Sequence, residues 1–129
     1  MILDSTFLID VLRGKASVEE LLGEVDVSGP PFVTSVTVME LYEGIYLAES
    51  TERERAVVEE MLDGINEIPF DRACGKRAGQ INAELVAAGE PIDETDVMIA
   101  ATALDYDLPV VTRNVDHFDR IDGIDVVSY

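Results

Sequence analysis

Short apolar runs alternate with longer amphipathic stretches along the whole chain. The runs predict buried strands, and the stretches between them carry apolar residues at helical spacing. The predicted strands are residues 2–3, 32–34, 65–70, 108–112 and 124–127. Short strands separated by helices are typical of parallel βαβ units. The pattern therefore predicts one α/β domain over residues 1–129, a three-layer α/β/α arrangement with a short, mostly parallel sheet.

Polar residues mark the expected starts of the helices. A Ser or Thr followed three residues later by Glu is a capping box, and such pairs occur at Ser17/Glu20, Thr37/Glu40 and Thr51/Glu54. The first box predicts a second short helix, and the other two predict helices that pack together as a hairpin. Asp71 is the expected cap of a helix that ends at Gly89. Residues 97–104 are apolar on all sides and predict a buried helix, with Asp93 or Thr95 near its start.

The composition argues against some classes of protein. The 129 residues include 27 acidic and nine basic ones, which gives a formal net charge of −18, yet 47% of residues are hydrophobic. That apolar fraction argues against disorder. The charge argues against a broad basic surface for nucleic acid, because phosphate binding normally relies on Lys and Arg. Acids spread over nearly every segment also suit a salt-rich, halophilic cytosol, where salt screens their repulsion.

Several sequence features point to the cytoplasm. The single cysteine, Cys74, excludes an intramolecular disulfide framework and a thiolate metal cluster. The N-terminal segment has no basic region and carries Asp4 and Asp10 within its apolar stretch, which is unlike a secretory signal. No apolar run approaches the ~18 residues of a membrane span, so no membrane association is expected.

Three acids stand where desolvation penalises them, which sets them apart from the acidic surface. Asp4 follows the first predicted strand, at the sheet edge where α/β proteins bind ligands, although it could also simply cap a helix. Glu40 lies within an apolar stretch, and its alternative role is the second half of the Thr37 capping box. Asp96 begins the most apolar helix beside two further acids, so an inward-facing carboxylate there needs a cationic partner.

The segment after the fourth predicted strand supplies more oxygen atoms at the same edge. Asn114 and Asp116 are the candidate ligands there. His117, the only histidine, precedes Phe118 and is interpreted as a packing residue, while Asp10 is interpreted as a surface residue on the first helix. Carboxylates gathered without a thiolate or imidazole favour Mg²⁺ or Mn²⁺ over zinc. Such a site can position phosphodiester oxygens despite the negative charge of the protein.

Four of these segments together resemble the PIN-domain ribonucleases of the VapC toxin type. They are residues 1–10 (MILDSTFLID), 37–41 (TVMEL), 96–101 (DVMIAA) and 111–118 (VTRNVDHF), in that order along nearly the whole chain. The resemblance implies a PIN-like fold and an endoribonuclease dependent on Mg²⁺ or Mn²⁺ that cuts structured or translation-related RNA. It also implies a homodimer and a cognate antitoxin that inhibits the enzyme. The acidic surface favours an antitoxin with a basic segment.

The resemblance also implies roles for individual residues. Asp4, Glu40 and Asp96 correspond to the core acids that bind metal and support catalysis. For the fourth acid, either Asp116 serves or the second metal is weakly held, because the first candidate in that region is the amide Asn114. The polar side chains expected to orient ligands or a phosphate are Ser5, Thr6, Thr112 and Asn114.

Two other function classes remain open at this point. A receiver-type phosphoacceptor domain also gathers acids and Mg²⁺ at a sheet edge, but it needs a Lys where this chain has Arg113. A catalytically weak PIN-like binding module is the other class, and Asn114 favours it.

Overall fold

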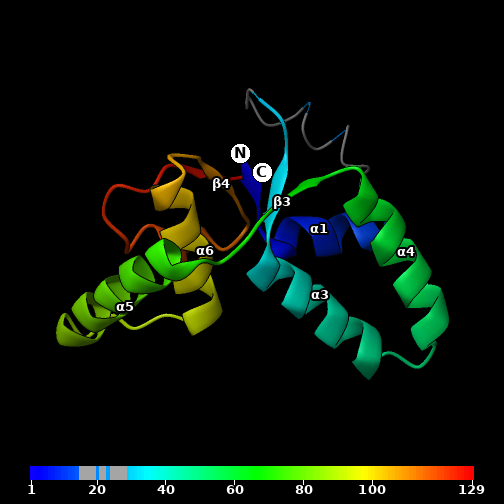
Figure 1. The fold of residues 1–129 in the computed structure, drawn as a ribbon, viewed down its shortest axis with the longest axis horizontal. Helices are drawn as coiled ribbons and strands as arrows, with labels where there is room; N and C mark the ends of the chain where they lie inside the picture. Colours follow the sequence, from blue (N-terminus) through cyan, green and yellow to red (C-terminus); the bar gives the residue numbers. More distant parts are fainter. Residues whose placement is uncertain (15–19, 21–22, 24–28) are drawn as a thin grey trace.

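The structure is a computed structural model that describes residues 1–14, 20, 23 and 29–129. It shows two groups of helices on either side of a narrow sheet (Figure 1). Ser17, the first half of the predicted capping box with Glu20, lies outside the described residues, as does most of the short helix that it would open.

The sheet is built from five short strands, and all of its strand pairs are parallel. The strands are β1 (Ile2–Leu3), β2 (Phe32–Thr34), β3 (Asn66–Ile68), β4 (Val110–Val111) and β5 (Val126–Val127), in the order β3-β2-β1-β4-β5. β1 is therefore central, with Ile2 in register with Phe32 on one side and with Val110 on the other. Because the strands are parallel, Asp4, Ser35 and Thr112 all follow strand ends at one edge of the sheet.

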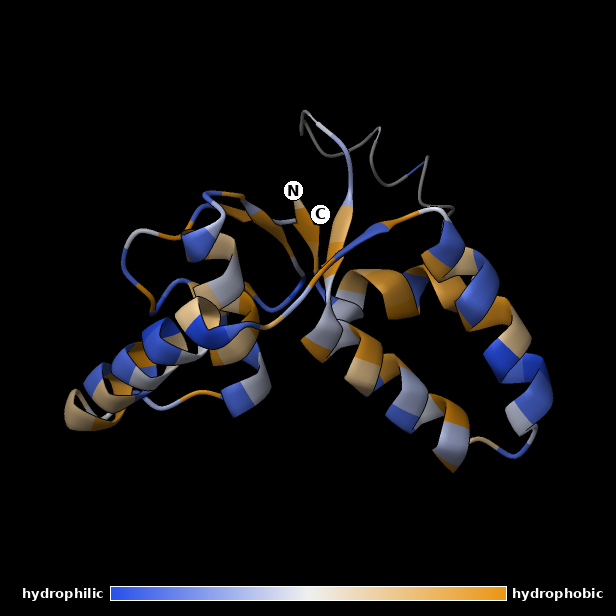
Figure 2. Ribbon diagram, viewed as in Figure 1, coloured by the Kyte–Doolittle hydropathy of each residue, from blue (hydrophilic) through white to orange (hydrophobic). Residues whose placement is uncertain are grey.

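Helices cover both faces of this sheet and bury two separate apolar cores. One face carries α1 (Ser5–Leu12), α3 (Ser35–Leu47) and α4 (Thr51–Asp63), and the other carries α5 (Arg72–Ala87), α6 (Glu94–Asp105) and α7 (Val115–Phe118). Neighbouring strand residues alternate between the cores: Ile2 and Val110 pack with the second group, while Leu3 and Val111 pack with the first. Figure 2 shows apolar residues along β1, β2 and α1 and many polar residues along β3, α4 and α5. The predicted three-layer α/β/α fold is confirmed.

Some helix starts differ from the sequence prediction. Thr34, not Thr37, caps α3, and its Oγ1 accepts a hydrogen bond from the Thr37 N–H at 3.2 Å. The predicted box at Thr51 is also wrong, because α4 begins after Ser50 without a side-chain cap. Asp71 caps α5 as predicted. The sequence reading missed α7 altogether, since four residues are too few to show helical periodicity.

Within the described part of the chain, every helix is too short or too polar to cross a lipid bilayer.

Candidate metal centre at the carboxyl edge of the sheet

Asp4 is buried between the end of β1 and the start of α1, with a relative exposure of 1%. As the residue before the helix, it accepts the Ser5 N–H at Oδ1 over 2.8 Å. Its Oδ2 accepts the hydroxyls of Thr112 at 2.6 Å and Thr6 at 3.1 Å. Three donors therefore fix the direction of this carboxylate, which is more than a helix cap requires.

Glu40 approaches the same region from α3. Because Thr34 is the cap, Glu40 is the sixth residue of α3 and lies beyond the capping-box position. The alternative role of Glu40 as the second half of a Thr37 capping box is therefore wrong. Burial raises the pKa of Glu40 to about 7, and the negative charges of Asp4 and Asp96 add to the increase, while a hydrogen bond from Ser5 opposes it. Its Oε1 atom is buried and accepts no hydrogen bond from any described residue.

Asp96 is the third residue of α6 and is buried. Its Oδ2 lies 2.7 Å from His117 Nδ1 and accepts a hydrogen bond from Asn114 Nδ2 at 3.0 Å. Burial raises the pKa of Asp96, and the charges of Asp4 and Asp93 raise it further, whereas the His117 contact lowers it. The structure thus brings Asp4, Glu40 and Asp96 close enough to raise each other's energy in the ionised state.

The hydroxyl side chains form a scaffold around these acids. Thr112 is fully buried, and its Oγ1 accepts the Asn114 N–H at 2.9 Å while donating to Asp4. Thr6 lies 3.4 Å from Thr112, oxygen to oxygen, and accepts the Arg113 N–H at 3.2 Å. All four predicted orienting residues therefore lie in the site, where they contact the acids or each other.

For three other residues, the surroundings in the structure differ from those expected from the sequence. Asp116 is exposed in the first turn of α7, and the side chains of this segment that reach Asp96 are those of Asn114 and His117. The interpretation of His117 as a packing residue missed this contact. The interpretation of Asp10 as a surface residue is wrong: it is 3% exposed, and it pairs with Arg113 and Tyr129.

The donor set fits a hard divalent cation. Mg²⁺ and Mn²⁺ prefer carboxylate and other oxygen ligands, which Asp4, Glu40 and Asp96 supply. A cation among them would satisfy the buried Glu40 Oε1 and remove the mutual repulsion that raises the pKa of Glu40. The ligand atoms of Asp93, Asp96 and His117 lie within 4.8 Å of one another, whereas Asp4, Glu40 and Asp96 are linked through the interaction of their charges.

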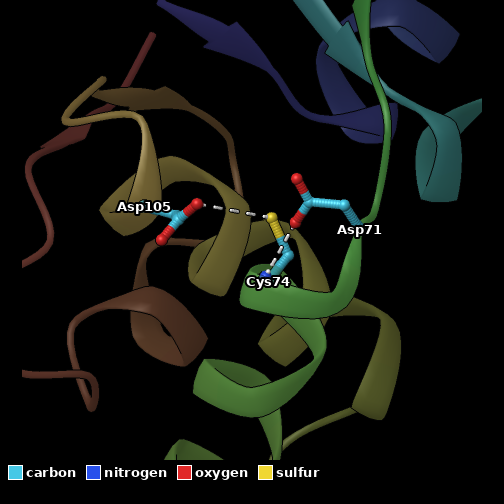
Figure 3. Close-up of side chains that lie close together, drawn as sticks. All are labelled: Asp71, Cys74 and Asp105. Atoms are coloured by element: carbon cyan, nitrogen blue, oxygen red, sulfur yellow. Dashed lines mark hydrogen bonds between the residues drawn. The ribbon is translucent and has the colours of Figure 1, made fainter.

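A second acidic cluster lies at the opposite end of α6, about 14 Å along the helix from Asp96. Figure 3 shows Cys74 between Asp71 and Asp105. The Cys74 N–H donates to Asp71 at 3.0 Å, and its thiol donates to Asp105 at 4.0 Å. Burial raises the pKa of Cys74, so the sulfur remains a neutral thiol and not a thiolate ligand. These contacts are explained by capping and side-chain packing.

An apolar groove of about 370 Å³ lies beside Glu40, between α1 and the hairpin of α3 and α4. Its lining residues are mostly aliphatic: Ile9, Leu12, Leu41, Ile45 and Val58, with Glu40, Glu54 and Arg13 among the polar ones.

Comparison with known proteins agrees with this arrangement. The family profile described as "PIN domain" matches residues 1–124. The chain belongs to the PIN-domain family. Among curated PIN-domain relatives, the chain is 36% identical over 123 residues to the tRNA(fMet)-specific endonuclease VapC of Shigella flexneri, covering 95% of this chain and 92% of the relative. It is 33% identical over 120 residues to ribonuclease VapC2 of Haemophilus influenzae, covering 92% of this chain and 89% of the relative.

Solved PIN-domain structures show the same fold. A chain in the crystal structure of DNA-bound VapBC from Salmonella typhimurium superposes with a TM-score of 0.88 at 33% identity, covering 98% of this chain and 96% of that chain. VapBC2 from Rickettsia felis, bound to a promoter DNA fragment, also gives 0.88 at 21% identity, which supports the fold alone. The resemblance inferred from the four motifs is confirmed, and the chain is a VapC-type PIN-domain nuclease. The receiver-type alternative is thereby wrong.

Proposed function

We propose that this protein is an endoribonuclease toxin that hydrolyses RNA phosphodiester bonds with the help of Mg²⁺ or Mn²⁺. The observation that carries the proposal is the convergence of three buried or half-buried carboxylates, Asp4, Glu40 and Asp96, beside an unsatisfied Glu40 oxygen. Relatives named for cleavage of RNA support the choice of substrate.

In this proposal Asp4, Glu40 and Asp96 hold the cation. When bound, the cation supplies Lewis-acid stabilisation of the charge that develops on the scissile phosphate and activates the attacking water. The protein's part is positioning. Thr112 and Thr6 fix Asp4 Oδ2, and Asn114 and His117 fix Asp96 Oδ2, so each carboxylate keeps one orientation before substrate arrives.

The decisive experiment is cleavage of labelled RNA in Mg²⁺ or Mn²⁺. The initiator tRNA is the first substrate to test, because the Shigella flexneri relative is named for it. Asp4→Asn and Asp96→Asn should each reduce the rate by at least about 100-fold, since each removes a charged ligand while keeping the side-chain shape. Glu60→Gln, an exposed acid on α4, is the matched control. Unchanged cleavage by both Asn variants would contradict the assignment of the metal site, and absence of cleavage by the unmodified protein would favour a binding module.

Asp116 remains the predicted fourth acid, and the Asp116→Asn variant tests this prediction separately. Asp116→Asn should reduce cleavage strongly if this carboxylate swings into the site with substrate. Near-normal cleavage would instead favour the other alternative, a second cation held weakly near Asn114 and His117.

We further propose that an antitoxin inhibits the enzyme by placing a basic and apolar segment in the groove beside Glu40. The groove combines aliphatic walls with the carboxylates of Glu40 and Glu54, and the structural relatives are VapBC proteins. Glu54→Lys, an exposed change in the groove lining, should weaken inhibition by the co-expressed antitoxin, as measured by RNA cleavage in the purified complex. We also propose that the protein is a homodimer, which light scattering of the purified protein tests. A cytoplasmic location is the last part of the proposal, and cell fractionation tests it.

A further inference from the structure

Arg113 is a cation placed directly at the edge of the acidic site. It follows Thr112 in the chain, and its backbone N–H donates to Thr6 Oγ1 at 3.2 Å. Thr6 in turn donates to Asp4 at 3.1 Å. The backbone of Arg113 is therefore tied to the same hydroxyl scaffold that orients Asp4.

The guanidinium of Arg113 forms an ion pair with a buried carboxylate. Its Nη2 lies 3.2 Å from Asp10 Oδ1, and the Asp10 side chain is only 4% exposed. The Tyr129 hydroxyl donates to Asp10 Oδ2 at 2.8 Å, and the Tyr129 ring packs edge-on against Phe7 with centroids 5.0 Å apart. Burial and the bond to Asp10 raise the pKa of Tyr129 to about 12, so the phenol stays a donor.

Solvent reaches the Arg113 side chain as well. The Arg113 side chain is 46% exposed, in contrast to the buried carboxylate with which it pairs. A shallow, open surface hollow of about 210 Å³ is lined by Thr6, Arg113 and Asn114. A guanidinium has five N–H donors in a planar fork that matches the oxygens of a phosphate, and the ion pair with Asp10 engages only Nη2.

We propose that this hollow binds an RNA phosphate adjacent to the scissile one, with Arg113 as its donor and Asp10 and Tyr129 as positioning residues. This inference rests on the proposed ribonuclease function. The phosphate is assigned as adjacent because the guanidinium is tied to Asp10 on α1, whereas the scissile group belongs with Asp4, Glu40 and Asp96. In a protein of net charge −18, a fixed cation at the mouth of the site offsets part of the repulsion toward RNA.

Binding and cleavage together test the phosphate contact. Binding of a fluorescent single-stranded oligoribonucleotide is measured by anisotropy in Mg²⁺ at several salt concentrations. These binding variants carry Glu40→Gln as well, which slows cleavage and leaves the contacts of Arg113 intact. Adding Arg113→Gln should weaken binding about tenfold or more. It should also reduce the salt slope, the slope of log affinity against log salt concentration, by about 0.7, which corresponds to the loss of one phosphate contact. Without the Glu40 change, Arg113→Gln should raise KM more than it lowers kcat.

Conservative variants test the geometry. Arg113→Lys should keep the salt slope, because the charge remains, but recover only part of the affinity, because the planar fork is lost. The charge-matched control is Arg53→Gln, an exposed arginine on α4. If Arg113→Gln and Arg53→Gln gave the same affinity and salt slope, the phosphate contact would be overturned. Loss of antitoxin binding alone in Arg113→Gln would assign the hollow to the protein partner and overturn it too.

A double-mutant cycle tests the positioning residues. Asp10→Asn should weaken binding several-fold with an unchanged salt slope, and should add nothing once Arg113 is already Gln. Tyr129→Phe keeps the ring against Phe7 and removes only the hydroxyl, so it provides the same test if Asp10→Asn fails to fold. Additive effects would overturn the positioning role.

The outcomes separate this inference from the ribonuclease proposal. Cleavage by the unmodified protein with no effect of Arg113→Gln overturns only the inference. Arg113-dependent binding without any cleavage overturns only the proposed activity.

Discussion

Replacing Glu40 by Gln should stabilise the metal-free protein at alkaline pH. In the absence of a cation, Glu40 is partly buried near two other acids, and its Oε1 accepts no hydrogen bond from any described residue. Gln has the same shape and no charge, so the substitution removes the repulsion without opening a cavity. The chain therefore gives up folding stability at this position to keep a carboxylate there.

The shift in the pKa of Glu40 sets the size of the effect. It rises from 4.5 to about 7 on folding. Below the lower value the side chain is protonated in both states and causes no penalty. Between the two values only the unfolded chain releases the proton, so stability falls as pH rises, and above the higher value the penalty is constant. The full shift corresponds to at most about 3 kcal/mol, and to about 2 kcal/mol once partial exposure is allowed for.

Urea unfolding in EDTA at pH 5, 6, 7 and 8 measures this difference. The stability advantage of the Glu40→Gln protein should be smallest at pH 5 and should grow to about 2 kcal/mol at pH 8. Addition of Mg²⁺ at pH 8 should stabilise the unmodified protein more than the variant. Glu60→Gln is the control and should give a curve parallel to that of the unmodified protein. Parallel curves for Glu40→Gln as well would refute the reasoning.

Three further changes test other parts of the structure. Thr112→Val removes the 2.6 Å bond to Asp4 and the acceptor of the Asn114 N–H, so it should lower stability by about 2 kcal/mol in urea unfolding, whereas Thr112→Ser should not. Equal stability of the Val and Ser variants would contradict this. Cys74 is fully buried and its pKa is raised, so a thiol reagent at pH 8 should label it only in urea; rapid labelling of the folded protein would show that the thiol is accessible. Asp107 has a φ of 53°, so Asp107→Gly should raise the unfolding free energy by about 0.5–1 kcal/mol, and a decrease would contradict the backbone argument.

The elements of the fold could be predicted because their signals are local. Most strands are apolar runs of a few residues, although β3 contains the exposed Asn66 and Glu67, and the helices show either an amphipathic period or, in α6, a continuous apolar run. The start of α3 was misplaced because Thr34 and Thr37 carry the same hydroxyl group three residues apart, and β2 passes directly into the helix without a loop. Local sequence does not distinguish the two caps.

The site was predictable to the extent that its acids interrupt apolar sequence. That signal identified Asp4 and Asp96, and it applied equally to Asp10, which lies between Ile9 and Val11. Asp10 was nevertheless assigned to the surface, because Arg113 and Tyr129, which contact it, are more than 100 residues away and no local pattern reveals these contacts. The same holds for His117, whose contact with Asp96 depends on how α7 is placed after β4.

The central position of β1 also governs when the sheet and the site can be completed during synthesis of the chain. The first strand to leave the ribosome must wait for β4, more than 100 residues later, before its second edge is paired. At about 5–20 residues per second this takes several seconds. Asp4 likewise lacks its Thr112 donor until that segment has emerged. A chain that ends before Thr112 therefore lacks both the β4 partner of β1 and the hydroxyl that orients Asp4.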